Sequence, residues 1–520
     1  MAAVLLLAVC LCGIGRLVLR SGHYPASWLA AGMGAVSLVT TVLGVTTAIP
    51  FSFLHVALII AGLVGIIWAA YTSPPSVHLP AAAILLALPL LVILSGGRAS
   101  QWDEFSNWLP SQLYLIEFDG FPRNDRPPNL SALPAYPYGL PFIGYLVART
   151  LGHFAEHATA LFNTTLAAFA GLLIAQLVQE GRRLSVVPSW PLLATGLLAA
   201  SLLNPAFVPK LVFTAYVDWT TAVVLAIAAV AVWRTLEAAL AGDTARTRGD
   251  AIAAGLALAA LVNLKQANLV LVLLVAIGGA VAWISTRPRH LPDALSLCAI
   301  LVPAMIVYAT WRQHVGTHIR GGDFSFLPLD SWLWDSVWDI AARMGSIAAK
   351  KGGYFGLMLV LMFFAARALW RGPDKFGRLA IVTATVFLGY NAFLYVTYVG
   401  AFGAFEGRNA ASYWRYNTQL GVLAVATAAF GLGQIWKDRL SASLKAYMTS
   451  RYVAGLAIGL ILLAPLTQLH RIRFDINPAK TYVRQVGSEI KTRLTPGSRL
   501  AVIDRQDNGF WALLIRYEVG

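Results

Sequence analysis

Long apolar blocks, separated by short polar connections, make up most of the chain. Runs such as Ala81–Leu94, Trp219–Val232 and Gly455–Leu466 contain no charged residue. About 20 helical residues cross a hydrocarbon layer of roughly 30 Å. A transmembrane β-barrel would instead alternate apolar and polar residues, and these blocks do not alternate. The pattern therefore predicts an all-α polytopic membrane protein.

The apolar blocks place about 14 transmembrane helices along the sequence. Their expected positions are 2–20, 28–48, 52–71, 80–96, 158–178, 189–207, 219–239, 251–264, 268–285, 294–311, 354–370, 379–399, 416–435 and 453–469.

Composition and charge exclude other classes of protein. Hydrophobic residues make up 58% of the chain and charged residues 12%, too few charges to cover a soluble protein of this size. The net charge of +15 comes from Lys and Arg gathered in short connections, so nucleic acid is not an expected partner. Cys10, Cys12 and Cys298 all lie in apolar blocks, which favours small core residues over disulfides or metal ligands.

The distribution of basic residues predicts the orientation in the membrane. Six of the seven connections expected on the inner side carry Lys or Arg, as the positive-inside rule requires. Long segments at 97–157, at 312–353 and from about 470 onward then fall on the outer side. The residue pattern of the tail, 471–520, predicts a small α/β unit with a helix at 479–494 and a strand at Arg499–Asp504. It is either an incomplete domain or a segment that docks on the outer loops.

The first outer loop begins with two adjacent carboxylates, Asp103 and Glu104, between Trp102 and Trp108. Tryptophan favours the membrane interface, so these carboxylates are expected near the depth of the lipid headgroups. They are either solvated loop charges or functional groups. The Pro- and Tyr-rich stretch that follows predicts an ordered surface instead of a flexible linker.

Three features of this region resemble the bacterial branch of the GT-C superfamily of membrane glycosyltransferases. They are the string Trp-Asp-Glu-Phe-Ser-Asn-Trp at 102–108, the Tyr- and Pro-rich stretch that follows, and an amphipathic segment at 139–152. In that family an acidic outer loop follows the first span, whereas here it follows the fourth. Residues 1–79 would then be extra N-terminal helices, and 80–470 the GT-C-like core.

The resemblance implies an inverting transfer of a sugar from a polyprenyl-phosphate donor. A carboxylate takes the proton of the acceptor hydroxyl, and a cation holds the departing phosphate. Asp103 is the expected general base, with Glu104 as the substitute. The acceptor would be a glycan, a lipid-linked saccharide or a protein. The expected location is the bacterial inner membrane, with the site facing the periplasm.

Four further charged residues lie at the outer ends of expected spans. Asp218 is either a helix N-cap or a second acidic residue that orients the acceptor or a metal. Lys265 either extends to the interface from a tight turn or faces a phosphate. Arg415 is the first candidate for binding the donor phosphate, and Arg408 is a further one. Alternatively, Arg415 pairs with Glu406 or with lipid headgroups.

Metal binding stays open at this stage. The pairs His153 with His157 and His314 with His318 have helical spacing. Glu156 lies between the first two, but the order is not that of a His-Glu-x-x-His zinc motif, and the second pair has no third ligand in its short segment. No cofactor is predicted with certainty, and a divalent metal remains an option. Two other classes of function also stay open. They are a transporter or flippase of lipid-linked saccharides and a non-catalytic membrane assembly protein.

The orientation can be tested by reporter fusions. A reporter inserted near Asp125 should behave as exported, because the 97–157 loop follows an even number of expected spans from an outer N-terminus. A fusion after Arg182 provides the cytoplasmic reference. A reporter near Asp125 that behaves as cytoplasmic would contradict both the topology and an outer-face reaction.

Overall fold

The computed structural model describes the chain except for residues 20–23, 185–186, 288–293, 320, 322–324, 496–497, 499 and 504–507. In the part described, eleven helical segments are long and apolar enough to cross a membrane. They are α1 (Ala2–Leu19), α2 (Pro25–Thr46), α3 (Phe51–Thr72), α4 (Pro74–Ser95), α7 (Ala158–Gly181), α10 (Val217–Leu240), α12 (Asn268–Ser285), α13 (Ala294–His318), α15 (Gly352–Arg371), α16 (Lys375–Gly400) and the consecutive pair α18 (Tyr413–Thr418) and α19 (Gly421–Asp438). The all-α polytopic architecture is confirmed.

The other three predicted spans are also helical, but they are shorter or more polar. α8 (Trp190–Ala200) has 11 residues and α21 (Arg451–Thr467) has 17. α11 (Thr244–Val262) begins with two arginines and an aspartate, so its first turns are polar. The count of 14 therefore exceeds the number of helices that meet both length and hydropathy in the described chain.

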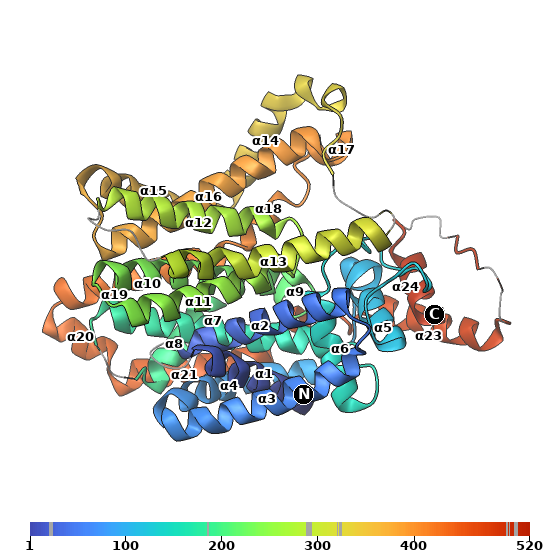
Figure 1. Cartoon of the computed structure of the whole chain (residues 1–520), viewed down its shortest axis with the longest axis horizontal. Helices are drawn as coiled ribbons and strands as arrows, with labels where there is room; N and C mark the ends of the chain where they lie inside the picture. The colour runs from blue at the N-terminus through green and yellow to red at the C-terminus, as the bar shows by residue number, and fades with distance from the viewer. Residues whose placement is uncertain are drawn as a thin grey trace.

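Nearly every residue of α7 and α10 is buried, which places these two helices at the centre of the bundle (Figure 1). α1 packs closely against α2 and α3 because glycines remove side chains at the crossings. A Cβ on Gly13 would lie 1.9 Å from the carbonyl oxygen of Gly62, and one on Gly32 would lie 1.8 Å from that of Leu11. Small residues allow such approach between membrane helices. The N-terminal helices belong to the same hydrophobic core as the later ones.

The elements of the first long loop and of the tail gather at one end of the bundle, called here the loop end, whereas α20 (Ala442–Met448) lies at the opposite end (Figure 1). The loop contributes the turn η1 (Glu104–Trp108) and the helices α5 (Leu109–Phe118) and α6 (Gly139–Leu151). The tail contributes α23 (Pro478–Arg493) and α24 (Phe510–Val519). The prediction that loop and tail share one side agrees with this arrangement.

The second long segment, 312–353, is largely helical in the part that is described. α13 continues to His318, so its first residues extend a span instead of starting a loop. The segment then forms the short turns η2 (Leu329–Ser331) and η3 (Trp334–Ser336), followed by α14 (Val337–Lys350). Three further short helices complete the fold: α9 (Pro209–Val212), α17 (Ala404–Arg408) and α22 (Leu469–Ile472).

The α/β prediction for the tail was wrong in the part that can be described. The predicted helix at 479–494 is confirmed as α23, and 510–517 is helical in α24. Residues 500–503 form no strand, whereas Arg499 and Asp504 lie outside the described residues. Leu500 and Ile503 are exposed, and a single extended segment without a partner strand is not stable.

Asp119 anchors the first loop to the bundle. It ends α5 in a left-handed conformation (φ 51°), and its carboxylate accepts hydrogen bonds from the Ser52 backbone N–H at 3.1 Å and the Ser52 hydroxyl at 2.6 Å. Arg149 Nη2 of α6 donates to it at 2.9 Å, and the Tyr145 hydroxyl also donates. Burial alone would raise the pKa of Asp119, but these donors and the Arg149 charge lower it overall.

Asp119→Ala should destabilise the protein by about 1–3 kcal/mol, because it leaves the Ser52 N–H and the Arg149 guanidinium without their acceptor. Alanine also tolerates the left-handed conformation poorly. Because the folded pKa is depressed, the contribution is present above the unfolded pKa and is lost as pH falls through the folded pKa. Thermal unfolding in detergent measures the effect. Asp125→Ala, at an exposed position of the same loop, is the control. Equal melting temperatures for the two variants would contradict this anchoring role.

Candidate functional site

The segment Trp102–Trp108 forms a helical turn that separates its two carboxylates. Residues Glu104–Trp108 adopt a π-helical turn, which runs directly into α5. Such turns occur frequently at functional sites. The wider turn directs Asp103 toward α18 and directs Glu104 into the protein, as the contacts described below show. The two adjacent carboxylates therefore have different surroundings: Asp103 contacts Arg415, and Glu104 accepts backbone N–H groups.

Glu104 is buried and holds backbone N–H groups. Its Oε2 accepts from the N–H of Ser100 at 2.7 Å and of Gln101 at 2.8 Å, and its Oε1 accepts from the N–H of Ala215 at 2.7 Å. Burial raises the pKa of Glu104 to about 7, although the three N–H donors oppose this shift. Glu104 therefore connects the start of the first loop to the turn that precedes α10.

Arg415 lies between two carboxylates that come from distant parts of the sequence. Its Nη2 is 2.6 Å from Asp103 Oδ2 and 2.7 Å from Asp218 Oδ2, and its Nε is 3.0 Å from the same Asp218 oxygen. The guanidinium carbon lies 4.4 Å from the centroid of the Tyr216 ring, within the range of a cation–π contact. Arg415 thus joins the first long loop, α10 and α18.

Asp218 is the most buried member of this group. Its Oδ1 accepts from Lys265 Nζ at 3.1 Å and from Gln419 Nε2 at 2.6 Å, whereas Arg415 holds its Oδ2. Asp218 makes no side-chain cap to α10, so the N-cap interpretation is not supported. The Lys265 side chain is also buried and faces Asp218, so the interpretation as an interfacial lysine is not supported either.

These four residues, Asp103, Asp218, Lys265 and Arg415, are called here the charge cluster. Two carboxylates balance two cations, as buried charges require. Exposure of the side chains is uneven: Asp218 is 0% exposed and Lys265 11%, whereas Asp103 is 21% and Arg415 24% exposed. A ligand would therefore reach the cluster at the Asp103–Arg415 end.

Arg408 is not part of the charge cluster. It is exposed on α17, and its Nε donates to the Ser336 hydroxyl at 3.1 Å. Arg415 does not pair with Glu406, because its guanidinium is engaged by the two aspartates.

The sequence analysis missed two residues at the site. Gln419 follows Arg415 by one helical turn, and its side chain links Asp218 to the Tyr390 hydroxyl, 3.0 Å from Gln419 Oε1. Helical spacing from Arg415 could have indicated it. Tyr216 gave no such signal, because its ring meets Arg415 only through the fold.

The described residues hold no group of three or more His, Cys, Asp or Glu side chains placed to bind a metal. His314 instead shares a hydrogen bond of 2.8 Å with the carbonyl of Pro122. Asp103 and Asp218 are both engaged by cations, which makes them a poor donor set for a divalent metal.

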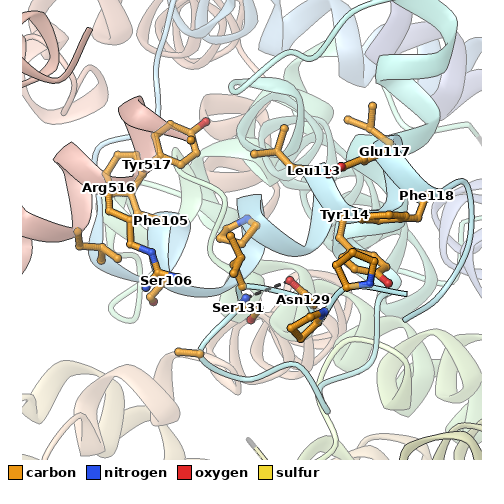
Figure 2. Close-up of a pocket in the computed structure, with 18 residues that line it drawn as sticks. Phe105, Ser106, Leu113, Tyr114, Glu117, Phe118, Asn129, Ser131, Arg516 and Tyr517 are labelled. Carbon is orange, nitrogen blue, oxygen red and sulfur yellow. Dashed lines mark hydrogen bonds between the residues drawn. The ribbon is translucent and has the colours of Figure 1, made fainter. Parts of the chain in front are cut away.

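A cavity of about 930 Å³ lies beside the same turn, between α5, residues 127–132 and α24. Figure 2 shows Phe105, Arg516 and Tyr517 on one side of this cavity and Tyr114 and Asn129 on another. The residues of the charge cluster do not line it. The turn at 102–108 therefore contributes to two features, the charge cluster and a partly aromatic cavity.

No family model and no curated protein matches this chain. Among solved structures, the chain is similar to the oligosaccharyltransferase of Archaeoglobus fulgidus, which was crystallised with a tethered acceptor peptide containing the NVT sequon. The sequence identity is 12% and the TM-score 0.43; the match covers 87% of this chain and 64% of that one. The chain thus spans less than two thirds of the length of that protein. A likeness at this level carries no argument about function.

Asp218→Asn should destabilise the protein, because it leaves Lys265 buried without a carboxylate. Removing one partner of a buried pair typically costs about 3–5 kcal/mol. The double variant Asp218→Asn with Lys265→Met should recover part of that loss, as measured by thermal unfolding in detergent. The exposed Asp330→Asn serves as control. A double variant that is no more stable than Asp218→Asn would show that the two residues are not coupled.

Proposed function

We propose that this chain is a GT-C-type membrane glycosyltransferase that transfers a sugar from a polyprenyl-phosphate donor at the periplasmic face of a bacterial inner membrane. The observation that carries the proposal is the contact of Arg415 with Asp103, at the exposed end of the charge cluster. A base and a phosphate-binding cation lie side by side there, where a lipid-borne donor and an acceptor hydroxyl would meet. The resemblance of the 102–108 string to that superfamily supports the same chemistry.

In the proposed reaction the acceptor hydroxyl oxygen attacks the anomeric carbon, and the bond from that carbon to the phosphate oxygen breaks. The hydroxyl proton goes to Asp103, and the phosphate leaves with the electron pair. Inversion follows from a single displacement. Protonation neutralises Asp103 and so weakens its hold on Arg415 at the moment when the leaving phosphate gains charge. Lys265 meanwhile continues to balance Asp218.

Asp103 suits the role of base better than Glu104. Both oxygens of Glu104 already accept backbone N–H groups, and its side chain is buried. We therefore assign Asp103 as the base, Arg415 as the main ligand of the donor phosphate, and Asp218 as the carboxylate that orients Arg415. Arg408, exposed on α17, takes no part in this scheme, and no step runs through a metal ion.

The acceptor is a glycan, a lipid-linked saccharide or a protein. The cavity beside the turn has aromatic and polar side chains, which suit contacts with a sugar ring.

A transporter or flippase is the weaker alternative. Transport requires polar groups along a path through the membrane. On α10, Asp218 near one end and Arg234 toward the other are separated by the apolar run Ala222–Trp233. The cluster thus has no polar continuation along this helix. This observation favours chemistry at one face over passage through the bundle.

The test is an assay of the purified protein with a panel of radiolabelled polyprenyl-phosphate sugars. Asp103→Asn should lower kcat by about 10²–10⁴-fold, because the amide cannot accept the proton. The variant should bind the donor at least as tightly as the wild type, because Arg415 no longer has a charged Asp103 beside it. Asp125→Asn, in the same loop and exposed, should leave kcat unchanged.

Variants of Arg415 test donor binding. Arg415→Ala should lower both donor affinity and turnover. Arg415→Lys keeps the positive charge but cannot donate two hydrogen bonds from a planar group, so it should restore donor affinity and turnover only in part. Near-normal turnover by Asp103→Asn would overturn the assignment of the base. Unchanged donor affinity in Arg415→Ala would overturn the assignment of the phosphate ligand.

A further inference from the structure

Arg484, on α23 of the tail, connects four separate parts of the loop end. The residue is 7% exposed. Its Nη2 donates to the carbonyl of Ala99 at 2.7 Å and to Glu156 Oε2 at 2.9 Å, and its Nη1 donates to Glu156 Oε1 at 3.2 Å. Nη1 also donates to Glu518 on α24. A single buried guanidinium thus holds α23, α24, the start of the first loop and the turn before α7.

Hydrogen bonds hold the backbone of Ala99, Ser100 and Gln101, the segment that leads to Asp103. The N–H of Ala99 donates to Glu156 Oε2 at 2.9 Å, while its carbonyl accepts from Arg484. The next two N–H groups, of Ser100 and Gln101, donate to Glu104. Asp103 follows two residues after Gln101. Its carboxylate is therefore placed by a segment whose polar groups are fixed from both sides.

Apolar contacts on the other side of the turn support the same arrangement. Phe105 packs against Tyr517 of α24, with ring centroids 4.9 Å apart, and Leu514 of the same helix belongs to the same small core. The Arg484 guanidinium carbon lies 5.5 Å from the Phe105 ring. The described helices of the tail thus contact Ala99 and Phe105, on either side of Asp103.

The geometry points to Arg484 as a positioning residue for Asp103: by holding Ala99 and Glu156, it fixes the segment that sets Asp103 against Arg415. This role rests on the proposed function, in which Asp103 is the base. A misplacement of a reacting group by about 1 Å can lower a rate by roughly 10²-fold. The tail would then be part of the working site, although none of its side chains belongs to the charge cluster.

The test compares Arg484→Gln with Arg493→Gln in the full chain. Arg493 lies on the same helix, is exposed, and has only a 3.9 Å contact with Glu489. Arg484→Gln should lower kcat by about 10–100-fold with donor affinity unchanged, and Arg493→Gln should change neither. Arg484→Lys should restore part of kcat, because its ammonium keeps the charge for Glu156.

A double variant distinguishes positioning from a general loss of folded protein. In an Asp103→Asn background, adding Arg484→Gln should change the residual kcat very little, because Arg484 affects kcat only by positioning Asp103. An equal fold-loss in both backgrounds would overturn the inference. So would a kcat for Arg484→Gln equal to that of the wild type. If Arg484→Gln fails to fold, Glu518→Gln removes one partner of Arg484 and is tested in the same way.

Hydrogen exchange gives a readout that does not depend on activity. Arg484→Gln should speed exchange of the Ala99, Ser100 and Gln101 amides, whereas Arg493→Gln should not. Unchanged exchange at these amides overturns the inference. If the wild type transfers no sugar, the proposed function fails, and the exchange data alone decide whether Arg484 fixes this segment.

Discussion

The ion pairs of Arg415 with Asp103 and Asp218 are the constraint on which the loop end depends. Each partner comes from a different part of the chain, so the contact brings together the first long loop, α10 and α18. The fully buried Asp218 would not be stable without its cations, and Lys265 needs Asp218 for the same reason. The cluster is neutral as a whole, but its exposed end can exchange partners. A group that neutralises Asp103, or an anion that competes for Arg415, shifts the whole arrangement.

The two ends of the bundle use charge differently. At the opposite end, Arg234 pairs with Glu180, and Arg378 makes a two-pronged contact with Glu237; these pairs join α7, α10 and α16. Such pairs fix helices whose interiors are apolar and closely packed. At the loop end, ion pairs such as Arg149 with Asp119 and Arg484 with Glu156 hold the first loop and the tail, whereas the charge cluster is partly open. The proposed reaction rests on this partly open cluster.

The first loop and the tail form an ordered cap because several polar anchors hold them. Asp119 connects α5 to α6 within the loop and to α3 of the bundle, Glu104 connects the loop to the turn before α10, and Arg484 connects it to the tail. Each anchor is an ionisable side chain that satisfies backbone or side-chain groups which would otherwise be buried without partners. The position of Asp103 is a consequence of these anchors, and not of the turn alone.

The sequence by itself determined the polytopic helical class, because blocks of about 20 apolar residues have few other stable forms in a membrane. It also indicated Asp103, Asp218, Lys265 and Arg415 as candidate site residues, because charged side chains at membrane depth are costly and usually have a functional role. It could not assign their partners: Arg415 meets Asp103 across 312 positions of sequence, and only helix packing sets that distance. For the same reason it named Glu104 as the substitute base, although this carboxylate is buried against backbone N–H groups, and it missed Gln419. Tertiary structure decided which charges are buried together, since burial depends on neighbours that lie far away in the chain.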